Sequence, residues 1–344
     1  MLQQTRSLQV PGVSTRASEL TAEALHLVAE TAVRDIATAL DAIVLRDLRK
    51  KGVVVGLSGG IDSSVVAALC AHALGSKRVL GLLMPERESA AETLELGGLV
   101  ADTLGIETVV EDITPILEAA GCYSRRDAAI RQLIPEYGPG WKSKVALPSV
   151  IDSDRFRIFS VIARSPDGAE TRARVTPVAY LQMVAATSFK QRTRKMMEYY
   201  HADRLNYAVA GTPNRLEYDQ GFFVRNGDGA ADVKPIAHLY KTQVYQLAEY
   251  LGVPETIRSR PPTTDTYSLP QTQEEFYFSL PYDQMDLCLY ARNNGIPAAD
   301  VAGALGLAEE QVERVFADID SKRRATRVLH LPPRLIAEVP EVGR

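Results

Sequence analysis

The chain has 344 residues, 46% hydrophobic and 24% charged, which suits one large globular domain with a substantial core. A net charge of −4 excludes an overall positive field that would recruit nucleic acid or anionic lipid, and three scattered cysteines without a CxxC pair argue against a disulfide framework or a structural zinc site. The start lacks a secretory signal, and no segment approaches the ~18 apolar residues that span a membrane, so we expect a cytoplasmic protein without a membrane partner.

The first part of the chain combines a polar tail with an apolar helix pattern. Residues 1–19 are polar and contain Pro11 and Gly12, which predicts a flexible tail. Apolar residues then recur at three- and four-residue steps, which predicts one long amphipathic helix over residues 20–48. Its apolar stripe is either part of the core or a surface for a second subunit.

Short apolar runs and helical patterns alternate over the next 60 residues or so. Three strands that alternate with two helices are typical of a parallel sheet with right-handed crossovers. The sequence therefore predicts an α/β fold with a doubly wound parallel sheet and helices on both faces. The strands are predicted at residues 53–57, 79–84 and 106–110, and the helices at about 62–74 and 90–104.

The alternation stops between about residues 121 and 177, where the chain is rich in Arg, Pro and Gly. An apolar run that begins at Phe156, a Ser165-Pro-Asp-Gly168 turn and the alternating run from Thr171 to Val175 predict a β-hairpin. We interpret this stretch as an inserted hairpin subdomain over one end of the sheet. Long ordered insertions often act as lids, and the loop 263–278 is a second candidate lid.

The sheet-and-helix pattern resumes after the insertion and continues to the end of the domain. The domain is predicted to span residues 20–330, and residues 331–344 form a C-terminal tail. The predicted elements are helices at about 178–202, 241–251 and within 282–324, and a strand at 207–210.

The clearest chemical motif is Ser58-Gly-Gly-Ile-Asp-Ser-Ser64, between a Val-rich strand and a helix. Its glycines allow the backbone to approach an anion, and the helix start offers free N–H groups and the positive end of a dipole. Asp62 offers a carboxylate for a magnesium ion on phosphates. The alternative is a turn that uses Gly and Ser only for its geometry. The predicted ATP-binding residues of this loop are Gly56, Ser58, Gly59, Gly60, Asp62, Ser63 and Ser64.

This loop is neither a Walker A motif, since no Gly-Lys-Ser/Thr follows, nor a GxGxxG fingerprint. It resembles the pyrophosphate-binding loop of the ATP pyrophosphatase superfamily, of the adenine-nucleotide α-hydrolase-like fold. The resemblance implies cleavage of ATP between its α and β phosphates. The loop alone does not indicate which member of the superfamily the chain resembles.

Further segments narrow the resemblance to the ammonia-dependent NAD synthetase family. They cover most of the chain outside the N-terminal tail and the insertion. The family resemblance implies a homodimer in which ATP and Mg²⁺ adenylate the carboxylate of deamido-NAD and ammonia then forms the amide. The segments are Ser188–Arg194, Gly211–Glu217, Gly221–Asp232, Pro235–Val244 and Pro262-Thr263.

The resemblance also implies roles for single residues. Asp62 and Glu217 would bind the metal, and Thr212, Lys241 and Thr263 would bind ATP. Lys241 also opens a predicted helix, where a cation opposes the dipole unless an anion lies nearby. The catalytic residues would be Asp62, Lys241 and Asp232. The acid dinucleotide would contact Arg192, Arg225, Asp232, Ser321 and Lys322.

The match departs from the family in several respects. The chain has no room for the nitrilase-like domain of glutamine-dependent members, so free ammonia or a separate glutamine amidotransferase is implied. Arg225 replaces a lysine and Ser321 a histidine of the small bacterial enzymes, which bears on substrate choice. Two alternatives therefore stay open. One is a sister amide ligase acting on another carboxylate, and the other is a nucleotide-binding protein that has lost catalysis.

Overall fold

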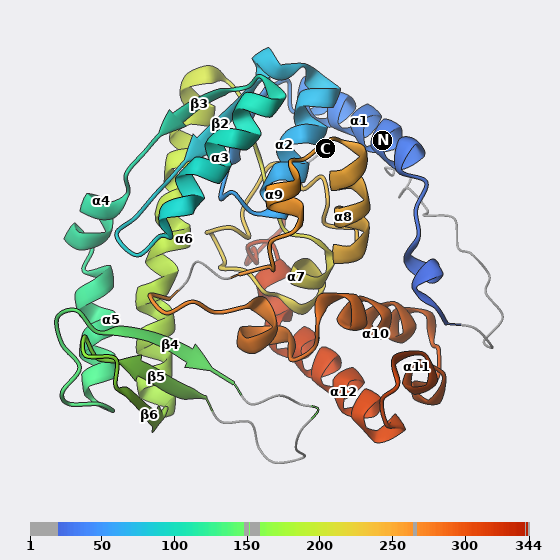
Figure 1. Ribbon diagram of the computed structural model, residues 1–344. Helices are drawn as coiled ribbons and strands as arrows, with labels where there is room; N and C mark the ends of the chain where they lie inside the picture. The colour runs from blue at the N-terminus through green and yellow to red at the C-terminus, as the bar shows by residue number, and fades with distance from the viewer. Residues whose placement is uncertain (1–19, 148–150, 152–158, 264–266, 341, 343–344) are drawn as a thin grey trace.

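The computed structural model describes residues 20–147, 151, 159–263, 267–340 and 342 (Figure 1). The predicted tail at 1–19 and the start of the predicted hairpin at 156–158 lie outside these residues. Within the described part, the central sheet, the insertion and the C-terminal helices occupy separate regions of the molecule (Figure 1).

Four parallel strands form the central sheet in the order β3-β2-β1-β7. The chain moves outward from β1 to β3 and returns on the other side of β1, where Val54 lies between Leu80 of β2 and Val209 of β7. The order reverses between β1 and β7, and ligands of such sheets bind at the carboxyl ends of the strands at this switch point. The strands are β1 (Val53–Gly56), β2 (Val79–Leu83), β3 (Glu107–Val110) and β7 (Ala208–Ala210).

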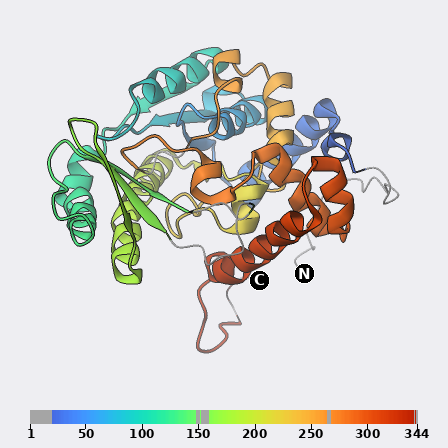
Figure 2. The same ribbon diagram turned by 60° about the horizontal axis from the view of Figure 1, so that its bottom comes forward.

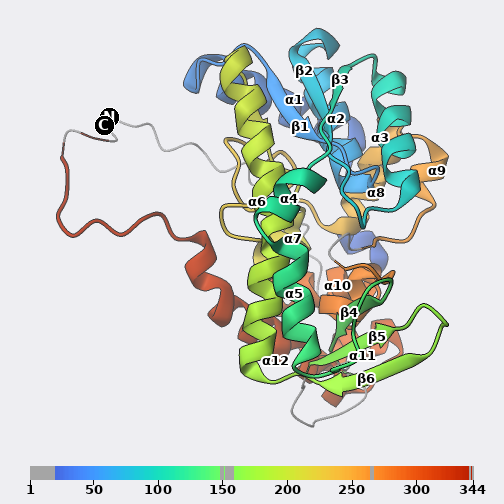
Figure 3. The ribbon, with the colours of Figure 1, turned by 90° about the vertical axis from the view of Figure 1, so that its left-hand side faces the viewer.

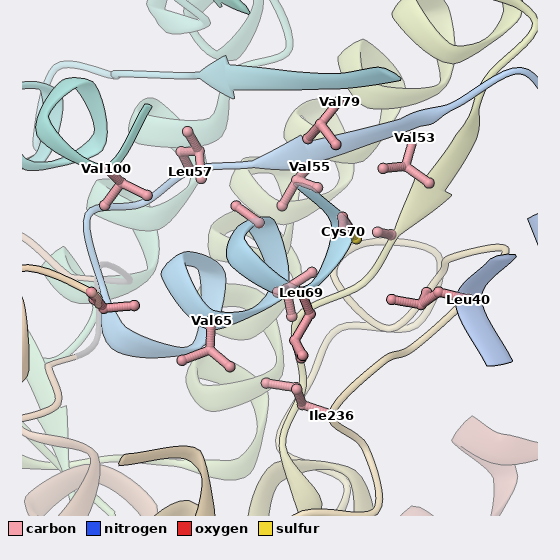
Figure 4. Packing of buried hydrophobic residues seen from close by; sticks show 14 of the residues in the cluster. Leu40, Val53, Val55, Leu57, Val65, Leu69, Cys70, Val79, Val100 and Ile236 are labelled. Atoms are coloured by element: carbon pink, nitrogen blue, oxygen red, sulfur yellow. The ribbon is translucent and has the colours of Figure 1, made fainter. Parts of the chain in front are cut away.

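Helices cover both faces of this sheet, as the alternating strand residues require. Val53 and Val55 point into one apolar cluster, shown in Figure 4, and Val54 points into another on the opposite face. Each fully buried Val or Leu side chain contributes roughly 1.5–3 kcal/mol as an upper estimate. The first cluster takes residues from α1 (Ala29–Asp41), α2 (Ile61–Leu74), α3 (Ala91–Leu104) and α8 (Lys241–Tyr250), and the second from α4 (Thr114–Ala119) and α6 (Pro177–Leu205).

The helix predicted over residues 20–48 is divided into a 3-10 turn η1 (Ala22–Leu25), α1 and a π-helix η2 (Ala42–Asp47). The break has a tertiary cause. Gln246 of α8 accepts a hydrogen bond from Leu27 N at 3.0 Å and donates one to Leu25 O at 3.1 Å, so backbone groups there are satisfied without a helix. The apolar stripe of α1 lies in the core.

The insertion contains the predicted hairpin and one further strand. β5 (Ser160–Arg164) and β6 (Glu170–Arg174) are antiparallel, and Gly168 N donates to Ser165 O in the turn between them. β4 (Lys142–Ala146) pairs with the other side of β5. The helix α5 (Cys122–Arg131) packs along α6, which runs from the central sheet down to this inserted sheet (Figure 3).

The C-terminal helices form a third region beside the insertion (Figure 2), with its own apolar cluster. No helix in the described ranges is both long enough and apolar enough to span a bilayer. The remaining elements are η3 (Ser76–Arg78), α7 (Arg215–Gln220), α9 (Glu255–Arg258), a π-helix η4 (Glu274–Phe278), α10 (Tyr282–Asn294), α11 (Ala298–Leu305), α12 (Glu309–Thr326) and η5 (Arg327–His330).

Candidate functional site

The Ser58–Ser64 motif forms the turn from β1 into α2, with Gly60 as the N-cap residue. Gly59 has φ +69°, and a Cβ atom there would lie 2.7 Å from Leu96 Cβ of α3. A side chain at this position would therefore be both strained and blocked. At Gly56 a Cβ atom would approach Glu198 Oε1 to 3.0 Å. Gly59 therefore lets the backbone turn tightly after β1, and Gly56 leaves room for the side chain of Glu198.

The serines of the motif differ in what they contact. Ser63 Oγ accepts from Ser58 N at 3.3 Å and donates to Gly60 O at 3.0 Å, and Ser64 Oγ donates to the same carbonyl at 2.8 Å. Both serines are buried, whereas Ser58 is exposed. The hydroxyls of Ser63 and Ser64 thus hold the turn in shape, and their predicted contact with phosphate stays a prediction.

Asp62, Lys241 and Glu217 come together beside this turn. Lys241 Nζ, 1% exposed as a residue, forms an ion pair with Asp62 Oδ2. Asn214 connects the two carboxylates, because its Nδ2 donates to Asp62 Oδ1 at 3.1 Å and its backbone N donates to Glu217 Oε2 at 3.2 Å. Asp62 begins α2 after β1, and Asn214 caps α7 after β7, so the switch point of the sheet places them side by side.

Electrostatic coupling within this cluster is strong. Burial, followed by repulsion from Asp62, raises the pKa of Glu217 to about 8. Burial alone would lower the pKa of Lys241, but attraction to Asp62 and Glu217 outweighs it, so that pKa is raised and the ammonium stays charged. With its raised pKa, Glu217 holds a proton at neutral pH, and a metal ion that bound both Asp62 and Glu217 would displace that proton.

Asp286 of α10 is a member of the cluster that the sequence did not reveal. Its two oxygens accept from Lys241 N at 3.2 Å and Thr242 N at 2.7 Å, so it caps the first turn of α8. Burial raises its pKa to about 7. The sequence offered one signal, because Asp286 is the only acid in the apolar run Met285-Asp-Leu-Cys-Leu289. An acid in such a run is rarely buried without a partner, so a buried contact for Asp286 could have been expected.

The carboxylates of Asp62 and Glu217 suit a magnesium ion whose coordination is completed by phosphate. Magnesium at nucleotide sites commonly takes one or two carboxylates, and the remaining ligands are phosphate oxygens and water. Asp62 and Glu217 supply two carboxylates that Asn214 holds together. The described residues contain no group of three or more His, Cys, Asp or Glu side chains arranged for a metal. A metal site built from protein side chains alone is thus not seen in that part of the chain. A site in which protein carboxylates and nucleotide phosphates bind the ion together is compatible with these residues.

The expected substrate residues lie apart from this cluster. Asp232 Oδ2 accepts from Val209 N at 2.8 Å and its Oδ1 from Tyr199 Oη at 3.3 Å, at the edge of β7. Arg192 and Arg225 are exposed neighbours, with Arg192 Nε donating to Arg225 O at 3.3 Å. These contacts leave their predicted roles toward the dinucleotide as predictions.

Four further residues of the prediction occupy other positions. Lys322 of α12 donates to Tyr277 O at 2.7 Å and lies over the Tyr277 ring, and its neighbour Ser321 is exposed. Thr212 follows Gly211 after β7 and is partly buried, at the same sheet edge as the Ser58 turn. Thr263 forms an antiparallel bridge with Thr272.

The three cysteines are expected to be unreactive. All are free and buried, and burial raises the pKa of Cys70 and Cys288 to about 12 and that of Cys122 to about 11. Because the thiolate is the nucleophile, iodoacetamide should label the native chain at least about a hundredfold more slowly than the unfolded chain. Mass spectrometry of both reactions measures this. Rapid labelling of Cys70 in the native chain would contradict the burial that the fold gives it.

The chain is similar to known proteins over most of its length. The family model described as NAD synthase matches residues 32–132 and 155–327. The chain is 62% identical over 320 residues to the NH(3)-dependent NAD(+) synthetase of Rhizobium meliloti (strain 1021), covering 91% of this chain and 96% of that protein. It is 36% identical over 246 residues to the protein of the same name from Thermotoga maritima, covering 71% and 81% of the two chains.

Solved structures support the fold. The NH3-dependent NAD synthetase of Campylobacter jejuni superposes with a TM-score of 0.58 at 22% identity, covering 90% of this chain and 100% of that chain. The NMN synthetase of Francisella tularensis superposes with a TM-score of 0.61 at 22% identity and with the same coverage. At this level of identity the likeness concerns the fold alone.

Proposed function

The chain belongs to the NAD synthase family, and on that premise we propose that it converts deamido-NAD to NAD with ATP and ammonia, releasing AMP and pyrophosphate. The observation that carries this proposal is the cluster of Asp62 and Glu217 around the buried Lys241, beside the Ser58 turn. The cluster lies at the switch point of a parallel sheet, where such folds bind nucleotides.

In the first step the substrate carboxylate attacks the α-phosphorus of ATP and pyrophosphate leaves. The backbone N–H groups of the turn and the N-terminal end of α2 would hold the departing phosphates. Lys241 supplies a positive charge beside them that cannot move far, since its ammonium is already fixed by Asp62. In such transfers the largest contribution to the rate comes from a fixed positive charge at the place where the leaving group develops negative charge.

Asp62 and Glu217 are the residues that would hold magnesium. When bound, the ion supplies Lewis-acid stabilisation of the phosphate oxygens. Asn214 orients both carboxylates for this task through its side chain and its backbone. Thr212 and Thr263 are proposed to contact the nucleotide.

In the second step ammonia attacks the carbonyl carbon of the acyl-adenylate, AMP leaves, and a proton is lost from nitrogen. Asp232 is proposed to lie near the reacting carboxylate, and Arg192, Arg225, Ser321 and Lys322 to bind the dinucleotide. No enzyme nucleophile is needed in either step. This agrees with the raised pKa values that burial gives the cysteines.

The proposal extends to partners and to assembly. Ammonia is taken up either free or from a separate glutamine amidotransferase, and the active form is a homodimer. The exposed apolar side chains of α6 offer one face for a second copy. They are Val178, Leu181, Met196 and Tyr200.

An assay of AMP and pyrophosphate release with ATP, Mg²⁺ and ammonium tests the substrate. Deamido-NAD is compared with its mononucleotide half and with unrelated carboxylates. We expect turnover with deamido-NAD to exceed that with the other acids by about a hundredfold or more in kcat/KM. Turnover with another acid alone would identify a sister amide ligase, and ATP binding without turnover on any acid would identify a protein that has lost catalysis.

A further inference from the structure

The segment 267–278 contacts the candidate metal-binding carboxylate Glu217. Gln273 Nε2 donates to Glu217 Oε1 at 3.0 Å. The other oxygen of this carboxylate, Oε2, accepts from Asn214 N at 3.2 Å. One hydrogen bond therefore holds each carboxylate oxygen, and the orientation of Glu217 depends on where Gln273 lies.

The same segment covers the free edge of β4. This strand pairs with β5 on one side only, and an uncovered edge would leave its backbone groups unpaired. Ser143 N donates to Ser268 Oγ at 2.8 Å, and Leu269 N donates to Ser143 O at 3.1 Å. Gln271 Nε2 donates to Val145 O at 2.8 Å. The segment thus joins the inserted sheet much as an added strand would.

Side chains strengthen this attachment. Tyr267 is buried in the apolar cluster of the insertion, and Phe276 packs against it with ring centroids 5.5 Å apart. Lys144 of β4 forms an ion pair with Glu275 at 2.5 Å. At the other end of the segment, Phe278 is buried in the cluster of the C-terminal helices. Gln273 lies between these two anchored ends.

We propose that Gln273 is a positioning residue for Glu217, and that the inserted sheet holds Gln273 in place through its edge strand β4. Since the metal role of Glu217 belongs to the proposed function, this proposal rests on that function. It gives the insertion a role at the nucleotide site, although its strands form a sheet separate from the central one.

The test measures binding of Mn²⁺ in the presence of ATP, by calorimetry or electron paramagnetic resonance, without acid or ammonia. Gln273→Met removes the donor and keeps the length of the side chain. Because a hydrogen bond to a charged group is lost, we expect the Kd of Mn²⁺ to rise about tenfold. The melting temperature should change little, since Gln273 is only partly buried.

The role of the insertion is tested with a matched pair of variants. Ser268→Ala combined with Lys144→Met weakens the attachment to β4, whereas Arg164→Met breaks the exposed Arg164–Glu170 pair on the β5–β6 hairpin. We expect about a threefold rise in the Mn²⁺ Kd for the first variant and none for the second. Hydrogen exchange at the Leu269 and Gln273 amides should be faster only in the first.

Each outcome decides the proposal. Wild-type affinity for Mn²⁺ with ATP in Gln273→Met would overturn the positioning role while leaving the proposed function intact. Weaker binding in Gln273→Met together with no effect of the β4 variant would overturn the role of the insertion. A wild-type chain that binds no Mn²⁺ with ATP would overturn both this proposal and the proposed function.

Discussion

Replacing Asp62 with asparagine should lower substrate-dependent exchange between ATP and pyrophosphate by about a thousandfold or more, a loss of ~4 kcal/mol of transition-state stabilisation. An asparagine amide keeps the size of the side chain but removes the negative charge that pairs with Lys241 and that would hold the metal. The positive charge of Lys241 would then face only Glu217 and Asp286. Exchange is measured with labelled pyrophosphate at saturating deamido-NAD.

Asp102→Asn provides the matched control, because Asp102 is an exposed carboxylate on the neighbouring helix α3. Its exchange rate should equal that of the wild type. Circular dichroism of Asp62→Asn must show a folded chain for the comparison to count. Near-normal exchange in folded Asp62→Asn would remove Asp62 from the metal site and leave its ion pair with Lys241 as a structural contact.

The family resemblance implied that Asp62, Glu217 and Lys241 act together, and the topology explains why Asp62 and Glu217 lie close, since each follows a strand of one parallel sheet. A strand-to-helix turn is a local signal, and the carboxyl ends of adjacent parallel strands meet at one edge. The β5–β6 hairpin was predictable for a similar reason, since a Ser-Pro-Asp-Gly turn lies between two runs of strand type.

Residues fixed by distant segments could not be predicted in this way. Asp286 caps α8 from α10, and Gln273 reaches Glu217 from a loop, so nothing in the local pattern of either segment indicates its partner. The break after η1 depends on Gln246, more than two hundred positions away in the sequence. β4 begins Lys-Ser-Lys, which has little strand propensity, and it becomes a strand through its pairing with β5.

Replacing Lys241 with methionine should both destabilise the chain and abolish exchange. Lys241 and Lys190 are both fully buried lysines, and Lys241 stands against Asp62, Glu217 and Asp286. Removing one partner of a buried ion pair costs ~3–5 kcal/mol because the remaining charges have no compensation. The exchange rate should fall about a thousandfold, since no fixed cation would then face the departing phosphates.

The effect of magnesium on the melting temperature should distinguish Lys241 from a buried lysine that lies away from the metal site. In Lys241→Met no ammonium balances the charge of Asp62, so a divalent cation bound between Asp62 and Glu217 should recover part of the lost melting temperature. Lys190 pairs with Glu86 and Glu88 at 2.8 Å each, in a cluster with Arg126 that already supplies a second cation. Lys190→Met should therefore lose stability that magnesium does not restore. Thermal unfolding of both variants with 0 and ~10 mM Mg²⁺ makes the comparison, and equal recovery in the two would contradict a metal site at Asp62 and Glu217.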